Sequence, residues 1–395
     1  MYLADTNQKT IVDRVSAIVQ SSICPNAVAT DANATFPKTS IQALADAGFF
    51  GLTLPKDVGG MAQPPRVFTA VVEEIAQACA STAMIYVMHI SATQGILNSK
   101  TLGSRENLMR DIASGNHLTT LAFSERGSRS QFWAPVSKLT ANKDGDDFTT
   151  NAIKSWITSA SHASSYVSSV QKPDAESPME VTVYLARPDA KGVEIGTGFN
   201  GLGLRGNDSV LVTFNEMPVA KSDLMTEQGK GASLMLEILL PWFAIGTAAM
   251  ANGLCRAAVS ATAAHLSATG FEHTNSQLRD LANLRSRLAD MSVRTEQSRA
   301  LLAHTVGSME MPTEMTPLYV LQSRLAAIEA AVDVTDLAMK ACGGAAFSNY
   351  LGVERHFRDA RAGWVMAPTA DHLRDFIGRA LTGMPLIVNL IEYTA

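Results

Sequence analysis

The stretch FTTNAIKSWITSA, residues 148–160, belongs to a series of short β-rich runs that decides the architecture of this chain. Its β-branched and aromatic residues are typical of strands. Similar runs follow one another in the middle of the chain, separated by Gly, Asp and Pro turns such as DGDD at 144–147. The runs are HLTTLAFSE (117–125), VSKLTAN (136–142), SSYVSSVQ (164–171), VTVYLARP (181–188) and SVLVTFNEMPV (209–219). They predict a β domain.

Helical patterns flank this β region on both sides. Apolar residues such as Val15, Ile18 and Val19 recur at helical spacing near the N-terminus, and residues 8–116 are expected to be largely helical. Beyond the β region, four long segments rich in Ala, Leu and Met predict a four-helix bundle: 232–268, 276–308, 315–342 and 352–365. We therefore expect an α+β protein with an N-terminal α-helical domain (1–116), a middle β-barrel or sandwich domain (117–228) and a C-terminal four-helix bundle (229–395).

Composition limits the possible functions. The 395 residues are 46% hydrophobic and 17% charged, enough to bury a large core. The net charge of −5 argues against a surface for nucleic acid or anionic membrane. Four widely spaced cysteines without a C-x-x-C pair predict neither disulfides nor a metal site. Without a basic, apolar leader or a run of about 18 apolar residues, we expect a cytoplasmic protein with no signal peptide or membrane span.

Six segments, in order over about residues 40–365, resemble the acyl-CoA dehydrogenase family, which has the same α–β–α order. They are LADAGFFGLTLPKDVGG (44–60), FSERGSRS (123–130), KSWITSA (154–160), GLGLRGNDSVLVTFNEMPV (201–219), LAMKACGGAAF (337–347) and RHFRDARAG (355–363). The second and third look like the family's two flavin-binding segments, and the last two look like segments that meet the flavin of a partner subunit. The resemblance therefore implies bound FAD and a homodimer or homotetramer.

The resemblance assigns the cofactor to one set of residues: Phe123, Ser124, Ser130, Trp156, Thr158, Lys340, Gly343 and Gly344. Trp156 offers a flat apolar face to the isoalloxazine, and the Thr158 hydroxyl suits the region of flavin N5. The glycines allow close approach of the backbone to the cofactor. The alternative is that Trp156 and Thr158 are ordinary strand residues and the glycine pair is a helix C-cap.

GTGFNG, residues 196–201, fits the G-x-G-x-x-G pattern of dinucleotide loops. A strand-like run follows it, however, whereas such a loop needs a helix N-terminus to receive the pyrophosphate. We interpret it as a turn of the β domain.

The chain departs from the family at its catalytic base, a Glu that removes the α-proton of the thioester. Ala367 stands where most members carry this Glu, and Phe243 stands where other members carry it. Loss of a general base costs about 10²–10⁴-fold in rate. Glu237 is a possible replacement, although a solvated carboxylate at the start of a helix is the simpler interpretation.

A second departure concerns the family's "R-K-T-F-G" stretch, which clamps the pyrophosphate of the partner's FAD. Phe271 in GFEHTNS (270–276) takes the place of its Arg. The loss of one charged hydrogen bond lowers affinity by roughly ten- to a hundredfold. Lys340, Arg126 or Arg129 can partly replace it, and the sequence indicates a flavin that is held less tightly.

With both departures, the chain most resembles the branch of the superfamily that contains indole and indole-3-acetate monooxygenases. These enzymes need no α-proton base, and take reduced FAD, with FMN possible, from a separate flavin reductase to react it with O2. The catalytic candidates are Ser124, Thr158 and His89. The predicted pocket for a small aromatic substrate consists of Phe132, Trp133, Trp242, Phe243, Trp364, Met366 and Ala367, with Phe376 nearby. Plain core packing is the alternative for each aromatic residue and for His89.

A substrate carboxylate would require a cation at the mouth of this pocket, and Arg126, Arg129 and Lys154 are the candidates. Two alternatives to a monooxygenase stay open: an acyl-CoA dehydrogenase with a relocated base, and a catalytically silent homologue. The residues do not decide the exact substrate, the choice between FAD and FMN, or the reductase.

Overall fold

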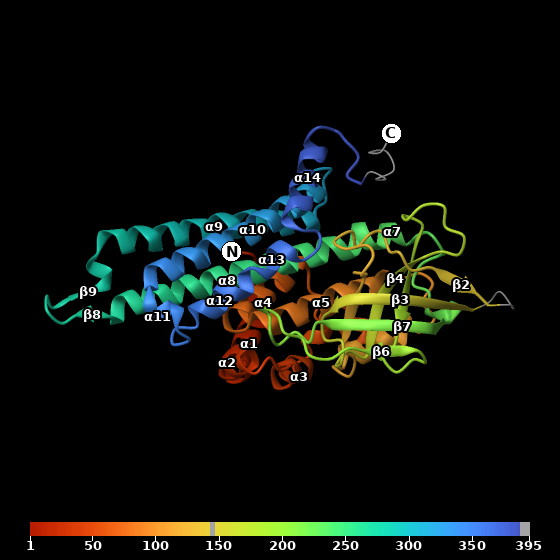
Figure 1. Ribbon diagram of the computed structural model, residues 1–395, viewed down its shortest axis with the longest axis horizontal. Coiled ribbons are helices and arrows are strands. Elements are labelled where there is room, and N and C mark those ends of the chain that lie inside the picture. Colours follow the sequence, from red (N-terminus) through yellow and green to blue (C-terminus); the bar gives the residue numbers. More distant parts are fainter. Residues whose placement is uncertain (143–146, 388–395) are drawn as a thin grey trace.

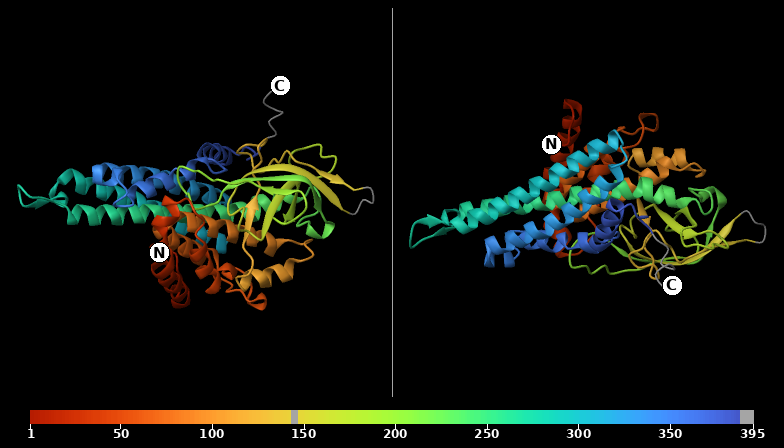
Figure 2. Two further views of the ribbon diagram at one scale, coloured as in Figure 1. Left: turned by 60° about the horizontal axis from the view of Figure 1, so that its bottom comes forward. Right: turned by 90° about the horizontal axis from the view of Figure 1, so that it is seen from above.

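The computed structural model describes residues 1–142 and 147–387, and shows an elongated molecule with a long helical bundle at one end and a β domain at the other (Figures 1 and 2). Helices come first and last along the chain, and the strands of the β domain lie between them, which confirms the predicted order. The predicted DGDD turn lies outside the described residues except for Asp147.

The N-terminal helices surround one apolar helix, α5 (Ala80–Asn98). Its sequence ASTAMIYVMHISATQGILN contains no Asp, Glu, Lys or Arg, and every residue from Ala80 to Ile96 is buried. It packs against α4, α8 and β1, and so joins all three parts of the molecule. The other elements of this part are α1 (Thr6–Ile18), η1 (Val19–Ile23), α2 (Cys24–Ala32), α3 (Lys38–Asp46), η2 (Phe49–Gly51), η3 (Lys56–Val58), α4 (Pro65–Ala78) and α6 (Arg105–Ala113).

The β domain is built from two sheets around a core of its own that includes Tyr166, Tyr184 and Phe214. One sheet has the order β1-β4-β5 and the other β2-β3-β7-β6, and only β1 and β4 pair in parallel. The strands are β1 (Thr119–Ala122), β2 (Leu139–Ala141), β3 (Phe148–Ile157), β4 (Ser165–Gln171), β5 (Val181–Ala186), β6 (Val193–Ile195) and β7 (Val210–Val219). The sequence did not predict β6, because a run of only three residues is too short to give a periodic signal.

The C-terminal bundle begins with a continuous helix made of α7 (Gly231–Ser233), η5 (Leu234–Leu239) and α8 (Leu240–Ala268). The predicted helix 276–308 begins only at residue 282, because a hairpin and a 3-10 turn, closed by the capping box of Gln277 and Asp280, precede it. The predicted helix 352–365 is broken in two. The elements are β8 (Gly270–Phe271), β9 (Ser276–Gln277), η6 (Leu278–Asp280), α9 (Ala282–Glu310), α10 (Thr316–Cys342), α11 (Gly344–Phe347), α12 (Val353–Ala360), α13 (Ala362–Val365) and α14 (Ala370–Leu381).

The helix Gly231–Ala268 is long and apolar enough to cross a membrane by length and composition, but 61% of its most apolar window is buried inside the protein. It contacts α4, α5, α9 and α10. It is a core helix of the bundle, and its apolar residues are accounted for by these contacts.

Candidate active site

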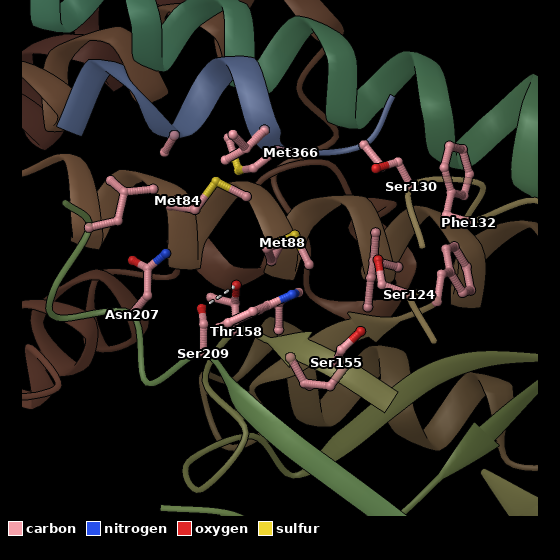
Figure 3. Close-up of a pocket in the computed structure, with 18 of the residues that line it drawn as sticks. Met84, Met88, Ser124, Ser130, Phe132, Ser155, Thr158, Asn207, Ser209 and Met366 are labelled. Atoms are coloured by element: carbon pink, nitrogen blue, oxygen red, sulfur yellow. Dashed lines mark hydrogen bonds between the residues drawn. The ribbon is translucent and has the colours of Figure 1, made fainter. Parts of the chain in front are cut away.

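A cavity of about 870 Å³ lies where the β domain meets α5, the start of α8 and the segment that follows α13. Figure 3 shows Thr158, Ser209 and Asn207 near one end and Ser124, Ser130 and Phe132 near the other, with methionines between them. The volume lies in the range of cofactor and small-molecule sites. Much of the lining is aliphatic: Met84, Met88, Leu121, Met235, Leu239 and Leu240.

Trp156 reaches this cavity because of a β-bulge. Along β3 the side chains of Phe148, Thr150, Ala152 and Lys154 are buried in strict alternation, so an unbroken strand would also bury Trp156. The pairing of β3 with β7 shifts between Lys154 and Ile157, and Trp156 takes a φ of 59°. As a result Trp156 is 69% exposed and is one of the residues that line the cavity. A large aromatic residue held in the left-handed region is a form of strain that occurs preferentially at functional sites.

A polar corner follows directly after the bulge. The Thr158 and Ser209 hydroxyls lie 3.2 Å apart and either can donate to the other. Asn207, on the same side of the cavity, is buried, and its Oδ1 atom has no hydrogen-bond partner among the described residues. The three side chains place hydrogen-bonding groups at one end of the chamber. The sequence predicted Thr158 but missed Asn207 and Ser209, although both lie in the quoted segment 201–219, because a residue's type does not show which way it points.

The loop that follows β1 forms the opposite end. Phe123, Ser124, Ser130 and Phe132 all line the cavity, as predicted for the flavin loop and the pocket wall. The loop is anchored to β3, since the backbone N–H of Ser155 donates to the Ser124 carbonyl at 2.9 Å. The rings of Phe123 and Phe132 stack with their centroids 6.4 Å apart.

A buried ion pair between Glu125 of this loop and Lys154 of β3 holds the loop in place. The Lys154 ammonium donates to Glu125 and to the Ser169 carbonyl, each at 2.6 Å, and Glu125 also accepts from the backbone N–H groups of Val136 and Ser137. Burial would raise the pKa of Glu125, but Lys154 and Ser137 outweigh it and hold the pKa below its usual value. Burial lowers the pKa of Lys154. Lys154 is therefore committed to Glu125, and the expectation that it could meet a substrate is corrected.

The wall where the family carries its base holds no carboxylate. Phe243, Met366 and Ala367 line the cavity there, as predicted. Among the described lining residues the only carboxylate is Glu125, which is already paired. Glu237 is exposed and does not line the cavity, so the structure does not support it as a relocated base.

A buried arginine stands behind this wall. The Arg324 guanidinium donates to the Met366 carbonyl at 3.0 Å and to the Ala367 carbonyl at 3.5 Å, and lies 4.8 Å from the centre of the Phe243 ring. Burial lowers the pKa of Arg324 to about 9, which leaves it charged at neutral pH. Its Nε atom has no partner in the part of the chain that the structure describes. Arg324 holds the wall in place with a positive charge that no described carboxylate neutralises.

His89 is a core residue and not part of the chamber. Its Nδ1 accepts from the Thr119 N–H at 3.2 Å, and its Nε2 lies 3.2 Å from the Phe50 carbonyl, to which it donates in the matching tautomer. Burial lowers the pKa of His89 to about 3, so the ring is neutral. The prediction that it faces the substrate is wrong, because both ring nitrogens are used within the core.

Three of the predicted wall aromatics also lie elsewhere. Trp133 packs edge-on against Phe376, with centroids 5.4 Å apart, and this contact holds α14 to the loop that follows β1. Trp242 packs against Phe68 at 5.5 Å, and Trp364 is half-exposed on α13. None of the three lines the cavity. Helical spacing identifies an apolar face, but does not tell a core contact from a cavity wall.

Lys340, Gly343 and Gly344 lie at the end of α10 and do not line the cavity of the same chain. Gly343 caps α10 with a φ of 55°, as in the C-cap alternative. A Cβ atom added at either glycine would meet nothing within 4 Å, and Lys340 is exposed beside Asp336. The surface is open on this side, and contact with the flavin of a second copy stays a prediction.

The cavity residues fit the isoalloxazine of FAD. The exposed indole of Trp156 offers a stacking face, the hydroxyls of Thr158 and Ser209 offer hydrogen bonds to a polar ring edge, and Asn207 carries an unpaired polar atom. The anchored loop around Ser124 lies at the other end. A flat, polar-edged cofactor can be accommodated in this cavity.

Comparison with known proteins identifies the family. The N-terminal, middle and C-terminal domain models of acyl-CoA dehydrogenase match residues 5–116, 120–217 and 229–382. The chain is 26% identical over 343 residues to bovine short-chain specific acyl-CoA dehydrogenase, covering 87% of this chain and 82% of that protein. It is 26% identical over 393 residues to 3-sulfinopropanoyl-CoA desulfinase of Advenella mimigardefordensis, covering 98% and 96%.

Solved structures show the same fold. Butyryl-CoA dehydrogenase from Megasphaera elsdenii superimposes with a TM-score of 0.91 at 21% identity, covering 97% of this chain and 100% of the other. PigA with FAD and proline superimposes with a TM-score of 0.89 at 17% identity, covering 97% and 99%. The three domain models together, matched in order along nearly the whole chain, show that this protein is a member of the acyl-CoA dehydrogenase superfamily of flavoproteins.

Proposed function

We propose that this protein is a cytoplasmic FAD-dependent oxidoreductase whose reaction uses no protein carboxylate as a base. One observation carries the proposal: the cavity wall presents Phe243, Met366 and Ala367, while the only carboxylate of the described lining is neutralised by Lys154. A reaction that depends on such a base would be about 10²–10⁴-fold slower in this site. The substrate must therefore react without it.

FAD bound in the cavity would supply two-electron redox chemistry. The chain's own residues would bind and orient it: Trp156 would offer a stacking face, and the hydroxyls of Thr158 and Ser209 would offer hydrogen bonds to a polar edge. The aliphatic side chains of α5 and η5 keep water out of the space beside the ring. These roles are the same whichever substrate the enzyme takes.

An acyl thioester is the first candidate substrate. The relatives named above are a short-chain acyl-CoA dehydrogenase and an enzyme that, by its name, removes a sulfinate group from a CoA thioester. The cavity lining agrees, because Met84, Met88, Met235 and Met366 give it the adaptable surface that suits a flexible chain. A thioester that does not rely on the enzyme to remove its α-proton is consistent with the carboxylate-free wall.

A reduced-FAD-dependent monooxygenase is the second candidate. Its support is the carboxylate-free wall, since such an enzyme needs none, together with the aromatic lining of Phe132, Trp156, Phe199 and Phe243. It would take reduced FAD or FMN from a flavin reductase and oxidise indole, indole-3-acetate or another small aromatic compound with O2. Phe271, at the position of the family's clamping Arg, favours weak flavin binding.

One experiment separates the candidates. FAD-loaded protein is titrated anaerobically with short-chain acyl-CoAs, and loss of the oxidised-flavin absorbance is recorded. In parallel, O2 uptake and indigo formation are measured with reduced FAD and indole. Binding of an acyl-CoA without rapid bleaching supports the first candidate, because α,β-dehydrogenation needs a base that this wall lacks, and substrate-dependent O2 uptake supports the second. Rapid bleaching by an acyl-CoA contradicts the base-free proposal. If FAD does not bind at all, the protein is a catalytically silent homologue and the proposal fails.

A homodimer or homotetramer is also proposed. Phe347 and Tyr350 are strongly exposed beside Gly343 and Gly344, in the segment where the resemblance predicts contact with a second copy. Exposed aromatic residues of this kind usually mark an interface. Light scattering on the purified protein tests this, and a monomer at micromolar concentration would contradict it.

A further inference from the structure

Four arginines line the cavity, and acidic partners neutralise two of them. Arg358 pairs with Asp31 at 2.5 Å and lies 3.6 Å from Glu354. Arg361 pairs with Asp336 at 2.5 Å. These two arginines therefore hold α12 and α13 in place, and they contribute little net charge to the chamber.

The other two, Arg126 and Arg129, have no such partner. Both side chains are exposed at the cavity, and within residues 1–142 and 147–387 neither makes an ion pair or a side-chain hydrogen bond. The nearest acid in sequence is Glu125, and its oxygens already accept from Lys154, Ser137 and Val136. Two positive charges at the chamber are thus left uncompensated.

The backbone that carries these two arginines is fixed. The Arg126 N–H donates to the Ile153 carbonyl at 3.1 Å, and the Arg129 N–H donates to the Glu125 carbonyl at 3.2 Å. Gly127 packs so closely on Val136 that a Cβ atom would lie 2.9 Å from a methyl group. Arg129 also has a φ of 52°, which is costly for a residue other than glycine and persists only where its surroundings impose it.

We propose that Arg126 and Arg129 form an anion-binding site at the mouth of the cavity, which takes the charged oxygens of the ligand bound inside. Guanidinium groups bind carboxylates and phosphates through pairs of parallel hydrogen bonds. The oxygens can belong to a phosphate of the flavin nucleotide or to an acidic group of the substrate. The inference rests on the proposed function only in naming these ligands, since the charge and the fixed loop exist without them.

The contrast between Arg126 and Arg129 on one side and Arg358 and Arg361 on the other supports this assignment. A cation that serves only to hold the fold is found next to its acid, as the latter two are. Cations that serve a ligand are left free beside the chamber and attract anions toward it. The site is therefore expected to raise both the affinity and the association rate of anionic ligands. Both quantities should decrease as the salt concentration rises.

The test uses the double variant Arg126→Gln/Arg129→Gln. Arg110→Gln is the matched control, because Arg110 is an exposed arginine paired with Glu106 outside the cavity. Dissociation constants are measured by fluorescence for riboflavin, FMN and FAD, and by calorimetry for inorganic pyrophosphate, indole and indole-3-acetate. Riboflavin and indole lack the anionic group and report on the rest of the cavity.

If the oxygens belong to the flavin nucleotide, the double variant binds FMN and FAD about tenfold or more weakly while riboflavin is unchanged. If they belong to the substrate, only indole-3-acetate loses affinity, and flavins and indole do not. Equal losses for riboflavin and FAD, or losses no larger than in Arg110→Gln, overturn the proposal. Pyrophosphate binding is measured without flavin, so failure of this site is distinguishable from failure of the proposed function.

Discussion

Introducing a carboxylate into the cavity wall that lacks one is the most direct test that the structure offers. Ala367 lines the cavity, and its neighbour Met366 does so too, on a segment that Arg324 holds by two carbonyl oxygens. Ala367→Glu therefore places an acid on a fixed backbone beside the chamber. A positioned general base is worth about 10²–10⁴-fold in rate, or roughly 3–5 kcal/mol of activation free energy. We expect the variant to gain acyl-CoA-dependent reduction of FAD by this factor.

The structure also indicates how far Ala367→Glu should lower the free energy of unfolding. Ala367 is half-buried, and an acid there is partly desolvated, which raises its pKa and opposes folding. Arg324, which is buried behind the same segment, has no carboxylate partner among the described residues and favours the ionised form. The two effects oppose each other, so we expect the free energy of unfolding to fall by no more than about 1–2 kcal/mol.

The assay is anaerobic bleaching of bound FAD by butyryl-CoA, with Ala367→Gln as the neutral control. Phe243→Glu tests the other position at which the family carries its base. A gain in Ala367→Glu and none in Ala367→Gln supports a thioester site with a missing base. If neither Glu variant gains activity although both bind FAD, the wall does not lie over the reacting carbon of a thioester, and the reasoning is refuted.

Three further predictions concern stability and binding. Burial lowers the pKa of both His89 and His356 to about 3. The unfolded chain therefore binds more protons than the folded one between about pH 6.5 and 3. The free energy of unfolding decreases as the pH is lowered through this range, and the decrease reaches about 2 kcal/mol per histidine at pH 5. Urea titrations at pH 7 and 5 should show this loss, and His89→Gln should reduce it; an unchanged pH dependence would contradict the cause. Lys154→Met leaves the Glu125 charge buried and should cost about 3–5 kcal/mol, whereas adding Glu125→Gln should recover part of the loss; a single variant that melts like the wild type would remove the case for a structural pair. Asn207→Leu deletes a side chain whose Oδ1 has no described partner, so stability should change by less than about 1 kcal/mol while the affinity for flavin or substrate falls about three- to tenfold; unaltered affinity would mean that Asn207 contacts neither.

The three-part fold could be predicted from the sequence, and the reason is physical. The middle strands and the flanking helices have different apolar periods, and β3 shows its period in the buried Phe148, Thr150 and Ala152. Trp156 is a different case. The same alternation would have buried it, and only the resemblance to a flavin-binding segment indicated that it faces a ligand. The bulge that turns it outward has no signature in the residue types.

His89, Trp133 and Trp242 were each assigned to the site as a single unusual residue in an apolar surrounding. The apolar helix α5 contains a single histidine, His89. A histidine in such a surrounding either contacts a ligand or forms hydrogen bonds to the backbone in the core. The Phe50 carbonyl and the Thr119 N–H that decide the matter are distant in sequence. Trp133 and Trp242 failed in the same way, since their partners Phe376 and Phe68 come from other elements. Ser124 and Thr158, which were assigned from the ordered series of segments, line the cavity. Lys340, Gly343 and Gly344 of the same series do not line the cavity of the same chain.

The charges around the cavity now form a consistent pattern. Arg324 keeps a positive charge behind the wall that lacks the acid, and Arg126 and Arg129 add two more at the mouth. Glu125, the single acid of the described lining, is cancelled by Lys154. The unpaired charges at the described part of the chamber are therefore positive, although the chain as a whole carries a net charge of −5. A chamber of this kind stabilises negative charge on whatever occupies it, and stabilisation of a developing anion reduces the need for a protein base to remove a proton first.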